Sequence, residues 1–255
     1  MAGHSKWANI KHRKERQDKK KGKVWSKCSR AIIAAARAGG PDPSANLTLR
    51  YAIDEAKYAN MPKDTIKRAI EKGAGAAGGE DFVSITYEGY GPCGVAIIVD
   101  ALTDNRNRTA PEIRSIFTKS GGNLGATGCV GYMFETRGQI LLSGTADEDT
   151  VMEIALEAGA EDVESPENPS EDDPGVWTVL TTASDFATVK DALEATDLEI
   201  LNAEIGKFPE TTTELHSSDA RKLLNIVDAL EDCDDVQKVY TNAAISDEDL
   251  AALEE

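Results

Sequence analysis

A stretch of small residues from Gly73 to Glu80 divides the sequence into two parts with different hydrophobic periodicity. Before it, apolar residues recur at spacings of three and four, which is typical of amphipathic helices. After it, they alternate with polar residues or form short solid runs, which is typical of β-strands. Because glycine and alanine offer little to pack, we interpret this stretch as a hinge or linker.

Before the linker, the apolar spacing predicts three helices, at about residues 24–38, 44–59 and 62–73. Gly39–Pro41 ends the first helix, and Pro62 opens the third. Residues 1–23 hold almost no apolar side chain to bury, so we expect them to be mobile when no partner is bound.

After the linker, the pattern predicts an α+β unit. Val83–Tyr87 alternates as in a strand with one wet face, and Val95–Val99 is solidly apolar as in a central strand. Thr109 and Glu112 form a capping-box signature, which predicts that a helix begins at this point. A further strand is expected at Val130–Phe134.

Residues 139–205 predict a second α+β unit with the element order βαββαβ. The expected strands are at residues 139–142, about 162, 176–181 and 198–205, and the expected helices are at 150–158 and 185–195. This order is that of the ferredoxin-like arrangement. A helix capped by Ser218 and a strand at 236–240 follow, and they most economically complete the preceding α+β unit.

These patterns predict an α+β protein with three domains. A basic arm and three helices form the first, residues 1–75. Residues 80–136 and 207–245 form a discontinuous α+β domain, and residues 137–206 form a ferredoxin-like α+β domain inserted in it.

Charge is divided unevenly along the chain. The net charge of −17 argues by itself against nucleic acid as a partner. Residues 1–72, however, hold 18 Lys and Arg against 7 Asp and Glu, a net charge of +11, whereas residues 73–255 hold 10 against 38, a net charge of −28. This division predicts one end that binds a polyanion and an acidic body that keeps the molecule soluble.

Other functional classes find little support in the composition. No stretch approaches the ~18 consecutive apolar residues of a membrane helix. The four cysteines lie far apart without a CxxC pair, which indicates reduced thiols rather than a zinc or disulfide framework. His216 is the only histidine outside the arm, so no catalytic set can be assembled. We therefore expect a cytoplasmic monomer that is not an enzyme and has no metal, cofactor, small-molecule substrate or membrane partner.

Several motifs resemble one protein family. They are Met1–Lys14, Asn60–Asp64, Arg68–Ile70, Tyr87–Pro92 and Leu102–Thr109. Together they are similar to the YebC/PmpR family over almost the whole chain. The resemblance implies three domains and probable transcriptional regulators that bind DNA; related mitochondrial proteins are translational activators of cytochrome c oxidase, and some bacterial members are described as ribosome-associated. Cys93 and Cys129 stand where the family motifs lead us to expect glycine and serine.

The basic arm is the first candidate site, because cations there are interleaved with aromatic rings. Its members are Lys6, Trp7, Lys11, His12, Arg13, Lys14, Arg16, Lys19, Lys20, Lys21 and Lys23. Lysine neutralises phosphate as a flexible point charge, and tryptophan can stack on an exposed base. The alternative is a solvated charge run that only aids solubility, which a strongly acidic chain does not need.

Arg106 and Arg108 form a second candidate site in the loop before the helix expected at Thr109. Free N–H groups at a helix start favour phosphate. Arg114 and Lys119 extend this surface along the helix. The structural alternative, in which Asp104 and neighbouring asparagines bind the arginines to fix the turn, is equally supported.

Lys63, Lys67 and Arg68 recur at near-helical spacing on the third helix and can continue the basic surface, although a solvated face is an equal alternative. The glycine-rich segment Gly121–Gly125 has no phosphate-loop motif, and we interpret it as a turn.

The leading hypothesis is a nucleic-acid-binding regulator of gene expression, with DNA and transcription favoured by the family resemblance. Charge alone does not distinguish DNA from RNA, so a ribosome-associated translation factor that binds RNA is the alternative. A protein-interaction scaffold without nucleic acid rests on fold analogy alone. An enzyme would need perturbed titratable groups clustered around Arg106 and Arg108.

Overall fold

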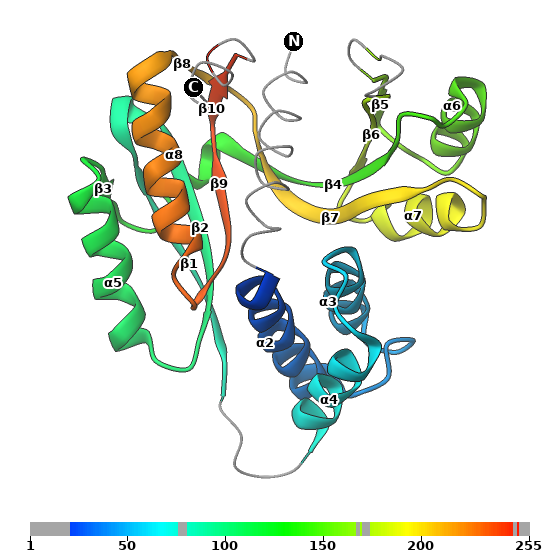
Figure 1. Cartoon of the computed structure of the whole chain (residues 1–255), viewed down its shortest axis with the longest axis horizontal. Helices are drawn as coiled ribbons and strands as arrows, with labels where there is room; N and C mark the ends of the chain where they lie inside the picture. Colours follow the sequence, from blue (N-terminus) through cyan, green and yellow to red (C-terminus); the bar gives the residue numbers. More distant parts are fainter. Residues whose placement is uncertain (1–20, 76–80, 167–168, 170–173, 247–248, 250–255) are drawn as a thin grey trace. The chain divides into compact units, whose positions relative to one another are not determined.

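The computed structural model describes residues 21–75, 81–166, 169, 174–246 and 249 (Figure 1). Internal contacts divide the chain into two compact units: Glu135–Phe208, and the described residues on either side of it. Helices and mostly antiparallel sheets are combined, which confirms the α+β fold class. The division into three domains stays a prediction. No helix in the described ranges is long and apolar enough to cross a membrane.

Three helices open the described chain: α2 (Lys21–Gly39), α3 (Leu47–Tyr58) and α4 (Lys63–Ala74). Their apolar faces pack together around Ile32, Leu49 and Ala56, none of which is accessible to solvent. Gly73 lets α4 approach α2 closely, because a Cβ there would lie 2.5 Å from the carbonyl oxygen of Ile33. α2 begins at Lys21, so residues 21–23, which were expected to be mobile, are helical.

Asn46 connects the end of α2 to the start of α3. Its Oδ1 accepts a hydrogen bond from the backbone N–H of Leu49 at 3.1 Å and so caps α3. Its Nδ2 donates to the carbonyl oxygens of Ala35 and Gly40, each at 2.8 Å. One buried amide thereby satisfies backbone groups of both helix ends.

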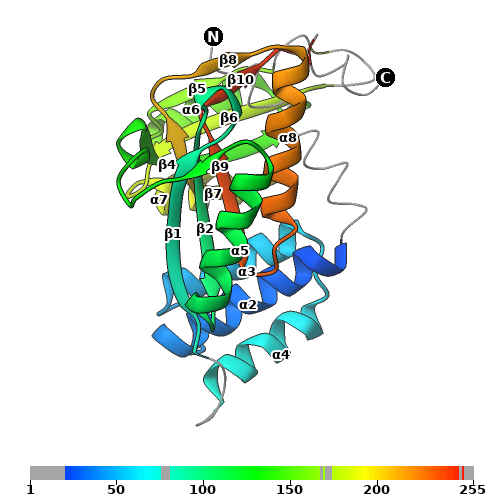
Figure 2. The same ribbon diagram turned by 90° about the vertical axis from the view of Figure 1, so that its left-hand side faces the viewer.

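A four-stranded sheet with the order β3-β1-β2-β9 follows the helices. Its elements are β1 (Val83–Tyr90), β2 (Ala96–Thr103), β3 (Asn123–Leu124) and β9 (Val236–Thr241), with the helices α5 (Arg106–Lys119) and α8 (Ser217–Glu231). Figure 2 shows α5 and α8 side by side over one face of the sheet. Val95, Ile97 and Val99 are buried in the core between sheet and helices, as the solidly apolar run predicts.

The short parallel pair of β8 (Thr213–Leu215) and β10 (Ala243–Ile245) is not predicted by the sequence pattern. Two 3-10 turns, η1 (Pro92–Gly94) and η2 (Gly131–Met133), interrupt the chain of this unit. In η1, Cys93 has a φ of 61°. The family resemblance leads us to expect glycine at this position. Glycine adopts a positive φ freely, whereas another residue pays a conformational cost of roughly 1 kcal/mol.

Three expectations for this unit are wrong. Helix α5 begins at Arg106 with Asn105 as its cap, so Thr109 lies buried inside the helix. The segment expected to be a strand at Val130–Phe134 is mostly the turn η2, because its backbone N–H groups bond to a buried carboxylate rather than to a neighbouring strand. Ser218 lies within α8, which His216 precedes.

The unit Glu135–Phe208 has the predicted element order βαββαβ. Its elements are β4 (Phe134–Ser143), α6 (Glu148–Glu157), β5 (Asp162–Glu164), β6 (Val176–Thr182), α7 (Phe186–Glu194) and β7 (Ile200–Pro209). The strands lie in the order β5-β6-β4-β7. Gly138 of β4 permits close packing of α7, because a Cβ there would lie 2.5 Å from the ring of Phe186.

Candidate nucleic-acid interface

Most of the basic arm lies outside the described residues. This applies to Lys6, Trp7, Lys11, His12, Arg13, Lys14, Arg16, Lys19 and Lys20, whose predicted role stays a prediction. Lys21 is the first residue of α2, and its side chain is not described. Lys23 is the first arm residue whose contacts are described.

Three cations on one face of α2 contact the acidic turn between α8 and β9. They stand at spacings of four and three, so their side chains lie along the same side of the helix. Lys23 donates to the carbonyl oxygen of Asp232 at 2.9 Å, Lys27 to that of Glu231 at 2.6 Å and Arg30 to that of Asp234 at 2.6 Å. These contacts stabilise the first turn of α2, which explains why the helix extends into the part of the sequence that lacks apolar residues.

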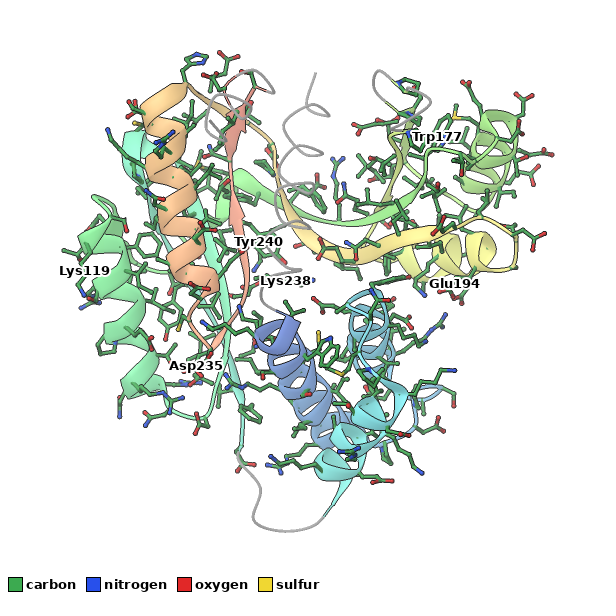
Figure 3. All side chains as sticks on the ribbon, in the orientation of Figure 1. Lys119, Trp177, Glu194, Asp235, Lys238 and Tyr240 are labelled. Carbon is green, nitrogen blue, oxygen red and sulfur yellow. The ribbon has the colours of Figure 1, made fainter. Side chains whose placement is uncertain are left out.

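Asp235, labelled in Figure 3 at the turn between α8 and β9, is the centre of this contact. Its carboxylate has a relative exposure of 4%. It accepts hydrogen bonds from Thr109 at 2.6 Å, Arg30 at 2.9 Å, and Thr103 and Arg108 at 3.0 Å each. Burial raises the pKa of Asp235, but the hydrogen bonds from Thr109, Arg108 and Thr103 outweigh it and hold the pKa below its usual value.

Arg108 is held by two carboxylates. Its Nη2 lies 2.7 Å from Oδ1 of Asp104 and 3.0 Å from Oδ2 of Asp235, and the hydrogen bonds to Asp235 and Asp104 both raise the pKa of the guanidinium. Two of the first backbone N–H groups of α5 already have a partner within the chain. Those of Asn107 and Arg108 donate hydrogen bonds to Oδ1 of Asn105 at 3.1 and 3.2 Å. The local, structural interpretation of this loop therefore applies to Arg108.

A cleft of about 520 Å³ lies beside this network. Its lining carries both signs of charge and one aromatic ring: Lys23, Arg30, Phe82, Asp104, Arg108, Glu112, Asp232, Asp234 and Asp235. Since five of these are acidic and three are basic, the cleft is not suited to a phosphate group.

Arg106, Arg114 and Lys119 of α5 are exposed. Figure 3 shows Lys119 on the outer side of this helix. No ion pair is described for these three side chains, whereas Arg108, whose side chain is 50% exposed, pairs with Asp104 and Asp235. Arg106 and Arg108 are close in the sequence and both exposed, and they differ in that Arg108 is bound by two carboxylates.

The cations of α4 form an exposed face. Lys63, Lys67, Arg68 and Lys72 are all exposed, whereas Ile66 and Ala69 face the helical core. Within the described part of the chain, the only ion pair of this group joins Lys67 to Glu71 at 4.0 Å, between side chains that are 76% and 62% exposed. Such a pair is worth little and leaves the lysine available to another anion.

Charge differs sharply between parts of the described chain. Residues 21–75 hold 11 Lys and Arg against 5 Asp and Glu, whereas residues 135–208 hold 3 against 19. The electrostatic potential therefore favours a polyanion at the helical segment and opposes one at the ferredoxin-like unit.

Two family models match the chain, one on each side of residues 77–81. Residues 5–76 match a family model described as the TACO1/YebC protein N-terminal domain, and residues 82–243 match one described as the TACO1/YebC second and third domain. The chain belongs to the TACO1/YebC family. This confirms the resemblance seen in the sequence motifs.

Similar proteins carry regulatory names. A "Probable transcriptional regulatory protein" of Pseudomonas fluorescens is 54% identical over 245 residues, which cover 96% of each chain. The "Transcriptional regulatory protein PmpR" of Pseudomonas aeruginosa is 53% identical, over 99% of this chain and all of that one. A crystal structure of the conserved hypothetical protein Aq1575 from Aquifex aeolicus, 46% identical, aligns with a TM-score of 0.77 over 89% of this chain and 91% of that one.

The surroundings of two residues, Asp235 and Tyr132, are not predicted by the sequence. Asp235 lies in the acidic run Glu231–Asp235, which resembles a solvated loop, and its burial depends on partners more than 100 residues away. Tyr132 lies in the segment expected to be a strand, yet it is 72% exposed.

Proposed function

We propose that this protein is a nucleic-acid-binding regulator of gene expression that acts on DNA in transcription. The observation that carries the proposal is the concentration of positive charge before residue 73 in a chain whose net charge is −17. The names of the relatives, which include transcriptional regulatory proteins, support the same function.

In this proposal, the arm and the exposed face of α4 contact phosphates. Lysine and arginine release counterions when they neutralise phosphates, which supplies affinity without sequence preference. Arg106, Arg114 and Lys119 add cations on α5. The acidic ferredoxin-like unit is repelled by the polyanion, so it orients away from the nucleic acid and is left accessible to other partners.

A pair of matched double variants tests the role of α4. Lys67→Gln/Arg68→Gln removes one lysine and one arginine from α4, and Arg221→Gln/Lys222→Gln removes the same types from the exposed face of α8. Both change the net charge equally. Lys222 pairs with Asp219 at 2.8 Å between exposed side chains, so its replacement costs little stability.

Affinity for a duplex DNA fragment is measured at several salt concentrations. We expect the α4 variant to lower the slope of log K against log salt by about 0.9 for each phosphate that is no longer neutralised, and the α8 variant to leave it unchanged. Equal effects of the two variants would mean that α4 acts only through the net charge of the protein and does not contact phosphates. Binding to structured RNA or ribosomes without binding to duplex DNA would replace transcription with translation as the process regulated.

A further inference from the structure

Tyr132 is an exposed aromatic ring on a segment without charge. Its side chain is 72% exposed, more than any other large hydrophobic side chain in the described ranges. The segment Ser120–Phe134 contains no charged residue and holds five glycines between Gly121 and Gly131. In a chain in which 29% of residues are charged, this segment can approach a polyanion without repelling it.

The backbone beside Tyr132 is fixed by a buried carboxylate. Glu88 is 7% exposed. Its Oε1 accepts a hydrogen bond from the N–H of Gly128 at 2.8 Å, and its Oε2 accepts from Val130 at 2.9 Å and Gly131 at 2.7 Å. Charge-assisted bonds of this kind are short and strong. The exposure of Tyr132 is therefore a property of an ordered turn.

Tyr132 also interacts with a second tyrosine, Tyr90. Burial raises the pKa of Tyr90, and the interaction with Tyr132, which includes a side-chain hydrogen bond, raises it further. The hydroxyl of Tyr90 donates in turn to the carbonyl oxygen of Cys129 at 3.1 Å. The bond from Tyr90 to Cys129 and the bonds to Glu88 hold the turn that carries Tyr132.

The surroundings of Tyr132 suit a single flat ligand better than a protein surface. The other exposed large hydrophobic side chains of the described ranges, Leu47, Val83 and Leu156, lie on α3, β1 and α6. A protein interface buries about 800 Å² on each partner and depends on clustered apolar anchors. The exposed ring of Tyr132 offers one π-face, which is what a nucleobase needs for stacking.

We propose that Tyr132 is a stacking platform for an unpaired nucleobase. The proposal rests on the proposed function and deepens it, because it specifies single-stranded or looped nucleic acid at this surface. Bases within a duplex are already stacked and would gain nothing from Tyr132. The cations of α4 and the arm contact phosphates, whereas Tyr132 contacts a base.

The test compares Tyr132→Ala and Tyr132→Phe in the full chain. The probes are a single-stranded oligonucleotide and a duplex with the same number of phosphates, each titrated at several salt concentrations. We expect Tyr132→Ala to weaken binding of the single strand about tenfold, the effect of removing one stacked base, and to change duplex binding less than about twofold. Tyr132→Phe keeps the ring and should stay within about threefold of the original chain, since stacking needs only the ring.

Two further readouts separate stacking from structural damage. The salt slope should not change in Tyr132→Ala, because the same phosphates stay neutralised. The fluorescence of 2-aminopurine in the oligonucleotide should be quenched by the original chain and by Tyr132→Phe, but not by Tyr132→Ala. Thermal unfolding of the three proteins establishes that each is folded.

Single-strand binding that is unaffected by Tyr132→Ala, or abolished equally for duplex and single strand, would overturn the stacking role. In each of these cases salt-dependent binding by the original chain still supports the proposed function. Absence of nucleic-acid binding by the original chain would reject both proposals.

Discussion

At the scale of single residues, Asp235 joins parts of the sequence that lie far apart. Its carboxylate accepts hydrogen bonds from α2, β2 and α5 through Arg30, Thr103 and Thr109. A buried carboxylate is stable only when such partners replace the water that it has given up. The geometry of the α2 contact and the start of α5 therefore depend on one ionised side chain.

We predict that Asp235→Asn lowers the free energy of unfolding by about 3 kcal/mol, because it removes the buried charge that pairs with Arg30 and Arg108. Chemical denaturation at pH 7 measures the decrease. Asp104→Asn is the matched control: Asp104 also bonds Arg108, but it is 33% exposed, and its replacement should cost less than about 1 kcal/mol.

The same variant carries a pH prediction. The folded-state pKa of Asp235 is lowered, so its stabilising effect is full above the unfolded pKa of about 4 and is lost as the pH falls through the folded value. The stability difference between the original chain and Asp235→Asn should therefore be constant near neutrality and close under acid conditions. A difference that widens as the pH falls would contradict the assignment.

At the scale of elements, local patterns predict most helices and strands but not their exact starts. The three amphipathic helices and the βαββαβ order follow from periodicity and from glycine and proline positions, as at Pro62. The start of α5 does not, because Asn105 caps the helix four residues before the capping-box signature at Thr109. Thr109 uses its hydroxyl for Asp235, a partner that no local pattern identifies.

The turn η2 depends on a carboxylate from another element. Glu88 of β1 accepts from three backbone N–H groups of residues 128–131, and this competes with the strand that the apolar run predicts. We predict that Glu88→Gln lowers the free energy of unfolding by about 2 kcal/mol, since a neutral amide accepts these bonds less strongly.

Hydrogen exchange provides a local measurement of the same change. In Glu88→Gln, the amides of Gly128, Val130 and Gly131 should exchange faster, whereas amides of α3 should not change. Glu135→Gln, at an exposed carboxylate that pairs with Arg137, is the control and should leave these amides protected. Unchanged exchange in Glu88→Gln would show that backbone contacts alone hold the turn.

At the scale of the whole molecule, the division of charge is the feature that the sequence predicts best. It needs only residue counts, and the described helices retain it, with 11 basic against 5 acidic residues at 21–75. The sequence does not predict which of these cations stay available to bind a polyanion. Arg108 and Lys23 are engaged by carboxylates or carbonyl oxygens distant in sequence, whereas those of α4 are exposed. Tertiary contacts determine which cations are engaged, and hydrophobic periodicity does not predict those contacts.

The most direct test of the central claim is the salt dependence of duplex DNA binding. It compares the intact chain with a chain that lacks residues 1–20, a deletion that leaves all of α2 in place. We predict that the intact chain binds with a steep salt dependence. The truncated chain should bind more weakly, with a slope reduced by about 0.9 for each arm cation that contacts a phosphate. Equal affinity and equal slope for the two chains, or no binding by the intact chain to DNA or RNA, would contradict the account.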